Sequence, residues 1–154
     1  MKNRAFLIAL AIFTLSLLDV SGCQQAPNVV QVAPIVGAWY TRVPGAPFEY
    51  QMYLFNADGT MQESNPDAGD AHTSDSAGYG SWTRRGEAVV AKFVEVTADR
   101  RTHAFVSRGE VSFELTVNGD RLSGTATGRF YDVRGALVLG PVHATIEGTR
   151  VRPQ

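Results

Sequence analysis

Residues 110–119 read EVSFELTVNG, and this stretch decides the fold class. Apolar and polar residues alternate through it from Val111 to Val117, a period of two that is typical of a β-strand with one buried face. Asn118-Gly119 then supplies a two-residue hairpin turn. Pairing across this turn carries one apolar face onto the next strand. The predicted partners are Leu115 and Leu122, Phe113 and Gly124, and Val111 and Ala126.

The rest of the chain after residue 35 follows the same pattern. Alternation recurs from Phe48 to Leu54 and ends at a turn, Asn56-Ala57-Asp58-Gly59. Further strands are predicted over residues 36–43, 60–64, 78–84, 88–96, 102–108 and 137–151, and no stretch has a helical period. Tight connections leave no room for crossovers, so we expect an all-β fold, a single antiparallel up-and-down β-barrel of about eight strands. A sandwich is the alternative, but closure removes exposed sheet edges.

The first residues have a different character. Lys2 and Arg4 precede an apolar run from Ala5 to Phe13, which is shorter than the roughly 18 residues that a spanning helix needs. Val20-Ser21-Gly22-Cys23 follows, and it resembles the lipobox of bacterial lipoproteins. The resemblance implies cleavage before Cys23 and acylation of that cysteine with fatty acids that include palmitate. An ordinary signal peptide followed by an incidental cysteine is the alternative; Cys23 is the only cysteine, so it has no intramolecular disulfide partner.

These patterns divide the chain into three parts. We expect a lipoprotein signal peptide over residues 1–22, a lipidated N-terminus and flexible linker over 23–34, and the β-barrel domain over 35–152. The implied location is the cell envelope, held to a membrane by acyl chains on Cys23. Gln24 after the cysteine favours the periplasmic face of the outer membrane if the source has two membranes.

Charge and motifs exclude several classes of function. The 154 residues carry a net charge of -1 and no Lys/Arg cluster, so nucleic acid is not expected as a partner. No glycine-rich phosphate loop or nucleophile elbow occurs, and we predict neither a cofactor nor catalytic residues. Residues 66–76 carry three carboxylates and an imidazole but match no calcium or zinc pattern. We interpret them as a solvated loop, one that could cover a barrel mouth.

Two short motifs near the ends of the predicted barrel carry a resemblance. Gly37-Ala38-Trp39 resembles the Gly-x-Trp motif of lipocalins and their calycin relatives, and Arg150 in Gly148-Thr149-Arg150 stands where that family has its closing arginine. The domain is also similar to small bacterial lipocalin-like domains, through residues 56–60 and 78–82. The resemblance implies that Arg150 packs over Trp39 to close one barrel end. It also implies that the open end binds small apolar molecules.

Alternation predicts which side chains line such a cavity. Extended back from Val111 and across the hairpin, it places His103, Phe105 and Phe130 inside, and Tyr50 and Met52 join them from the strand that begins near Phe48. A mostly aromatic lining with a few polar groups is typical of a ligand pocket. The alternative is that these side chains fill a narrow barrel completely.

Two glycines limit how far the alternation extends. A bulge at Gly109 would turn His103 outward, and a bulge at Gly140-Pro141 is needed to keep Ala144 and Ile146 inside. The direction of His103 therefore stays open at this point, as does that of Glu95.

The sequence thus predicts an envelope lipoprotein whose barrel binds or carries a small hydrophobic molecule or lipid. One alternative is an interaction or inhibitor module with an envelope protein as partner, using Tyr40, Tyr53 and Tyr131 on the outer surface. A contiguous exposed aromatic patch would favour it. A second alternative is a barrel cyclase or isomerase, which needs His103 or Glu95 to project into a closed apolar chamber.

Overall fold

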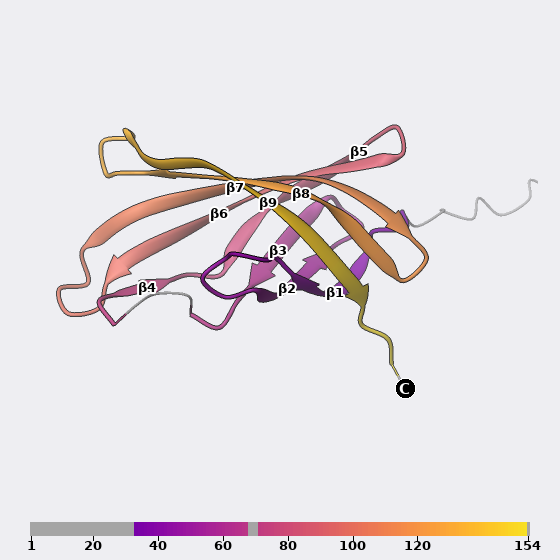
Figure 1. Ribbon diagram of the computed structural model, residues 1–154, viewed down its shortest axis with the longest axis horizontal. Coiled ribbons are helices and arrows are strands. Elements are labelled where there is room, and N and C mark those ends of the chain that lie inside the picture. Colours follow the sequence, from indigo (N-terminus) through magenta and orange to yellow (C-terminus); the bar gives the residue numbers. More distant parts are fainter. Residues whose placement is uncertain (1–32, 68–70, 154) are drawn as a thin grey trace, which may run out of the picture. The chain divides into compact units, whose positions relative to one another are not determined.

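The computed structural model describes residues 33–67 and 71–153 (Figure 1). The expected signal peptide and Cys23 lie outside the described residues. A compact unit begins at residue 31 and contains the whole β-sheet and its core. The described part of the chain contains no helix with the length and apolar character needed to cross a bilayer.

The structure consists of β-strands joined by turns and loops. The strands are β1 (Gly37–Arg42), β2 (Tyr50–Phe55), β3 (Thr60–Ser64), β4 (Thr73–Asp75), β5 (Gly78–Arg85), β6 (Ala88–Asp99), β7 (Phe105–Asn118), β8 (Arg121–Tyr131) and β9 (Leu137–Arg150).

Eight of these strands close into an antiparallel barrel. Each strand pairs with its neighbour along the chain, and β9 pairs with β1, where Trp39 stands opposite Arg150. Figure 1 shows the long strands β6 to β9 crossing one side of the barrel and the shorter β1, β2 and β3 on the other. The prediction of an all-β, up-and-down, lipocalin-like barrel of about eight strands is confirmed.

The one strand outside the eight-stranded ring is β4, which lies in line with β5 along the same edge of β6. It pairs with the end of β6, where Thr73 stands opposite Asp99, because β6 continues past the first residue of β5. The backbone groups of Thr97–Asp99 would otherwise form an unpaired edge. The interpretation of residues 66–76 as a loop is therefore wrong for Thr73–Asp75.

The β7–β8 hairpin differs from its predicted register by two residues. Asn118 pairs with Arg121, so the turn is Gly119-Asp120, and Gly119 adopts a φ of 59°. Phe113 consequently stands opposite Ala126 rather than Gly124. Because the shift is an even number of residues, the apolar side chains still face the interior.

One end of the barrel is filled by its core. Large buried side chains occupy it: Trp39, Phe55, Met61, Leu115, Leu122 and Ile146. Trp39 Nε1 donates to the Ile35 carbonyl at 2.7 Å, which satisfies the one polar atom of the indole. We call this half the closed end, and the half near the β1–β2 and β8–β9 loops the open end.

Arg150 joins the first and last strands at the closed end. Its guanidinium lies 4.2 Å from the centroid of the Trp39 ring, and its Nη1 donates to the Val36 carbonyl at 2.7 Å. Gly37 permits this approach, because its φ is 128° and a Cβ there would stand 2.9 Å from Arg150 Nη1. The contact implied by the lipocalin resemblance is therefore present, and it explains why glycine precedes the tryptophan by two positions.

Candidate functional site

A cavity of about 360 Å³ occupies the open half of the barrel. The β1–β2 loop, residues 43–48, and the inner faces of the strands form its walls. This volume falls in the range of roughly 300–1,000 Å³ that is common for ligand pockets. Filled core and open pocket, the two alternatives left by the sequence, thus coexist in different halves of one barrel. The apolar lining includes Tyr53, Phe93, Val111, Phe113 and Phe130.

Three aromatic rings form a contiguous apolar wall of the cavity. Tyr53 meets Phe113 at 5.4 Å and Phe93 at 6.3 Å between ring centroids, both edge to face, and Phe93 lies 5.5 Å from Phe113. The Tyr53 hydroxyl donates to Gln51 Oε1 at 2.8 Å, so its polar atom is satisfied. Such mutual ring packing fixes the shape of the wall.

A buried glutamate interrupts this apolar surface. Glu63 on β3 lines the cavity and is only 1% exposed. Its Oε2 accepts the Gly78 backbone N–H at 3.1 Å, whereas its Oε1 accepts no hydrogen bond from the described residues. Burial raises the pKa of Glu63 to about 7, although the Gly78 N–H and the nearby Asn65 amide lower it in part.

Glu95 on β6 also lines the cavity. It stands opposite Gly109 on β7, and Gly109 in turn stands opposite Phe130 on β8. A Cβ at position 109 would lie 2.7 Å from Glu95 Oε1 and 2.9 Å from the Phe130 ring, so only glycine leaves room for both side chains. Burial, followed by the charges of Glu63 and Asp75, raises the pKa of Glu95 to about 7.

Glu63 was not predicted as a lining residue, and the direction of Glu95 was left open. Period-two alternation with Met61 and with Phe93 would have placed both inside, but carboxylates are rarely assigned to a barrel interior. Glu95 lines the cavity, as the barrel cyclase or isomerase alternative requires, but this cavity lies at the open end of the barrel and is not a closed apolar chamber.

The predicted lining residues divide between the cavity and the outer face. Phe130 lines the cavity. Tyr50 and Met52 are 50% and 42% exposed, on the outer face of β2, and Tyr53 occupies an inner position instead. The alternation assigned to this strand was therefore wrong by one residue, because both faces of β2 carry large apolar side chains.

His103 and Phe105 lie outside the cavity. Thr97 pairs with Ser107 but Ala98 pairs with Phe105, so β7 contains one extra residue, Val106, which turns Phe105 outward. His103 lies in the β6–β7 loop, exposed, with a φ of 60°. The bulge occurs here and not at Gly109, which pairs regularly.

The expected bulge at Gly140-Pro141 is present. The register between β8 and β9 shifts at this point, and Ile146 is fully buried with Ala144 packed against the core.

The outer face of β1 and β2 carries an exposed aromatic pair. Tyr40 and Tyr50 stack with centroids 5.6 Å apart and ring planes 9° apart, and Met52 stands beside Tyr40 on the same face. We call these three residues the tyrosine patch. The expectation that Tyr53 also faces outward is wrong, since it is 2% exposed. Tyr131 is partly buried, with the Arg108 guanidinium 5.1 Å from its ring centroid.

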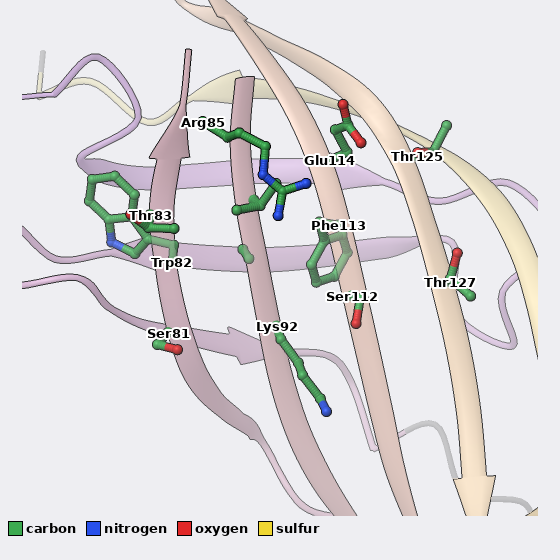
Figure 2. Close-up of a pocket in the computed structure, with 12 residues that line it drawn as sticks. Ser81, Trp82, Thr83, Arg85, Lys92, Ser112, Phe113, Glu114, Thr125 and Thr127 are labelled. Atoms are coloured by element: carbon green, nitrogen blue, oxygen red, sulfur yellow. The ribbon is translucent and has the colours of Figure 1, made fainter. Parts of the chain in front are cut away.

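A second hollow, of about 520 Å³, lies on the outer side of β5 to β8 (Figure 2). Figure 2 shows its polar side chains, among them Lys92, Ser112 and Thr127, on strands that run side by side. Lys92 is paired with Glu110 at 2.5 Å. This hollow is larger than the inner cavity, but most of its lining is polar, with Trp82, Val90, Ala91 and Phe113 between the polar side chains, and it lies on the outer side of the sheet. The inner cavity, with the buried Glu63 and the half-buried Glu95, is therefore the candidate site.

The described residues thus form an eight-stranded up-and-down β-barrel that is packed at one end and hollow at the other. No protein-family model, curated protein or solved structure matches the chain. Residues 33–67 and 71–153 contain no group of three histidine, cysteine or acidic side chains close enough to hold a metal ion.

Proposed function

We propose that the protein is a lipid-anchored envelope protein whose β-barrel binds or carries a small hydrophobic molecule. The observation that carries this proposal is the cavity of about 360 Å³, walled by buried aromatic and aliphatic side chains. Burial of a ligand against such walls gains about 25 cal/mol for each Å² of apolar surface removed from water.

The division of the barrel into two halves supports this function. The closed end holds the strands in register through the core and the Arg150 contacts, so the open half does not need a packed interior for stability. A site preformed on a rigid scaffold binds its ligand without a large ordering cost.

Native mass spectrometry of residues 24–154, purified gently from the source organism, tests this proposal. This segment contains the whole compact barrel unit. We expect a stoichiometric small molecule that is released and identified on denaturation. A ligand-free mass that persists after exposure to a lipid extract of the organism would contradict carriage. Chemical conversion of an added molecule would favour the barrel-enzyme alternative instead.

Anchoring through Cys23 has its own test. Replacement Cys23→Ser removes the thiol that the lipobox resemblance marks for acylation. We expect the protein to move from the membrane fraction to the soluble fraction of disrupted cells, while the barrel keeps its circular dichroism spectrum. Unchanged membrane association would contradict acylation at this residue.

The tyrosine patch favours a second candidate, an interaction module. Exposed tyrosines that stack in a fixed geometry are typical of protein interfaces. Photo-crosslinking from position 50, with exposed Thr83 on the polar outer face as the matched control position, tests this candidate. A defined adduct from position 50 alone would support it, and equal labelling from both positions would contradict it.

A further inference from the structure

The cavity has an unusual balance of charge for an apolar site. Three acidic side chains line it, Glu63, Glu95 and Asp75. The one histidine in the lining, His143, is exposed, with its Nδ1 3.1 Å from the Thr127 hydroxyl, and no lysine or arginine lines the cavity. Ion pairs of the described barrel, such as Lys92 with Glu110 and Arg100 with Asp67, do not involve Glu63, Glu95 or Asp75. The cavity therefore holds no lysine or arginine beside its carboxylates, which would attract a cationic group of a ligand.

Glu63 shows most clearly that a partner is missing. Its carboxylate is almost completely buried, and one oxygen accepts the Gly78 N–H. The other oxygen has the Asn65 amide nearby, but no described donor meets hydrogen-bond geometry with it. Leaving a buried acceptor without a donor costs roughly 1–3 kcal/mol, and more for a charged one. A ligand N–H at this oxygen would remove that cost.

Glu95 lies on β6, on the neighbouring wall of the cavity. The missing side chain at Gly109 gives its carboxylate space beside the Phe130 ring. Glu63 stands opposite Gly78 on β5, and Val94, the partner of Tyr79, directly precedes Glu95 on β6. Only Gly78, which has no side chain, therefore stands between the two glutamates, and both line the same cavity.

The aromatic wall beside these carboxylates suits the same ligand. Tyr53, Phe93 and Phe113 present an apolar surface for a hydrophobic body. Aromatic ring faces also attract a cation. An anionic ligand such as a fatty acid would instead bring a like charge to two glutamates in a site of low dielectric constant.

We propose that the ligand of this cavity is a hydrophobic amine, whose protonated amino group binds the Glu63 and Glu95 carboxylates and whose apolar body packs on the aromatic wall. This inference rests on the proposed carrier function and specifies its ligand class.

Matched ligands of one chain length test the inference. Calorimetric titration of residues 24–154 with octylamine, octanol and octanoate compares a cation, a neutral molecule and an anion with the same apolar tail. We expect octylamine to bind at least about tenfold more tightly than octanol, and octanoate to bind most weakly.

Variants then locate the interaction. Glu63→Gln keeps a carbonyl oxygen to accept the Gly78 N–H, and Glu95→Gln keeps the side-chain volume, so both are expected to fold. Each should lower octylamine affinity by about tenfold and leave octanol binding unchanged. Glu114→Gln, the same change on the outer face of β7, is the matched control and should alter neither.

The outcomes separate this inference from the carrier function. Octanol or octanoate binding as tightly as octylamine, with Phe130→Ala weakening all three, would overturn the amine inference and leave the carrier function standing. Loss of octylamine preference in Glu114→Gln but not in the inner variants would also overturn it. Absence of binding by all three ligands, together with a ligand-free native mass, would overturn both.

Discussion

Glu95 and Gly109 stand directly opposite each other on β6 and β7, and the hydrogen atom that replaces a side chain at Gly109 leaves the space that the glutamate carboxylate occupies. Glycine at this position is therefore a requirement of the cavity and not of backbone conformation.

Filling this space should close the site. Gly109→Leu adds a side chain between Glu95 and Phe130, and we expect binding of an apolar dye such as Nile red to fall by at least about tenfold. Thr116→Leu adds the same side chain to the exposed outer face of β7 and serves as the control. Fluorescence titration measures both. Equal affinity in the two variants would contradict the assignment of the cavity.

Inner and outer aromatic residues should differ in their effect on binding. Phe130→Ala removes part of the cavity wall, and we expect dye affinity to fall by roughly tenfold. Tyr50→Ala removes a ring of comparable size from the outer face and should leave dye affinity unchanged. The reverse result would show that the dye binds at the tyrosine patch.

The Arg150 contacts should stabilise the whole barrel. Arg150→Ala removes the ring contact with Trp39, the hydrogen bonds to the Val36 and Pro34 carbonyls, and an ion pair with Asp120. We expect the free energy of unfolding to fall by about 2–4 kcal/mol in urea denaturation. Arg152→Ala removes only an exposed ion pair with the same aspartate and should cost less than about 1 kcal/mol. Equal losses in the two variants would contradict a special role for Arg150.

The two cavity glutamates, Glu63 and Glu95, should make the barrel less stable as pH rises. The folded-state pKa of Glu63 and that of Glu95 are raised from 4.5 to about 7, so the folded state holds more protons than the unfolded state between these values. The free energy of unfolding then falls as pH increases from about 4.5 to about 7, and stays lower above that, by roughly 1–3 kcal/mol for Glu63.

Comparison with the double variant Glu63→Gln, Glu95→Gln isolates this effect. Surface carboxylates whose pKa is lowered, such as Asp120 beside Arg152, lose their contribution to folding stability only below about pH 4. They are present in both proteins, so they do not affect the comparison. Urea denaturation between pH 4.5 and 8 should show a decline in the parent protein and a flatter profile in the variant. Parallel profiles would show that these glutamates do not titrate in this range.

The barrel could be predicted from the sequence because its strands alternate strongly. Residues 110–119 have one apolar face and a marked turn, and even a register displaced by two residues kept the correct side chains inside. The contact of Arg150 with Trp39 followed from a resemblance and not from alternation. Its physical basis, the close approach over Gly37, is visible only in the structure.

The cavity lining was harder to predict, for two physical reasons. The faces of β2 both carry large apolar residues, so alternation did not distinguish Tyr50 from Tyr53. In β7 the extra residue is Val106, and nothing in its chemistry marks a bulge, so Phe105 was assigned to the wrong face. Glu63 and Glu95 break the hydrophobic pattern, as residues at functional sites often do.

The pairing of β9 with β1 also has a kinetic consequence. The hydrogen bond from Arg150 to Val36 joins residues 114 positions apart in the chain, whereas the other barrel strands pair with their sequence neighbours. Local hairpins form quickly, and contacts of such large sequence separation form slowly. The hairpins between neighbouring strands should therefore form before β9 pairs with β1. The rate of that last pairing, which closes the barrel, should set how soon a newly made chain can hold a ligand.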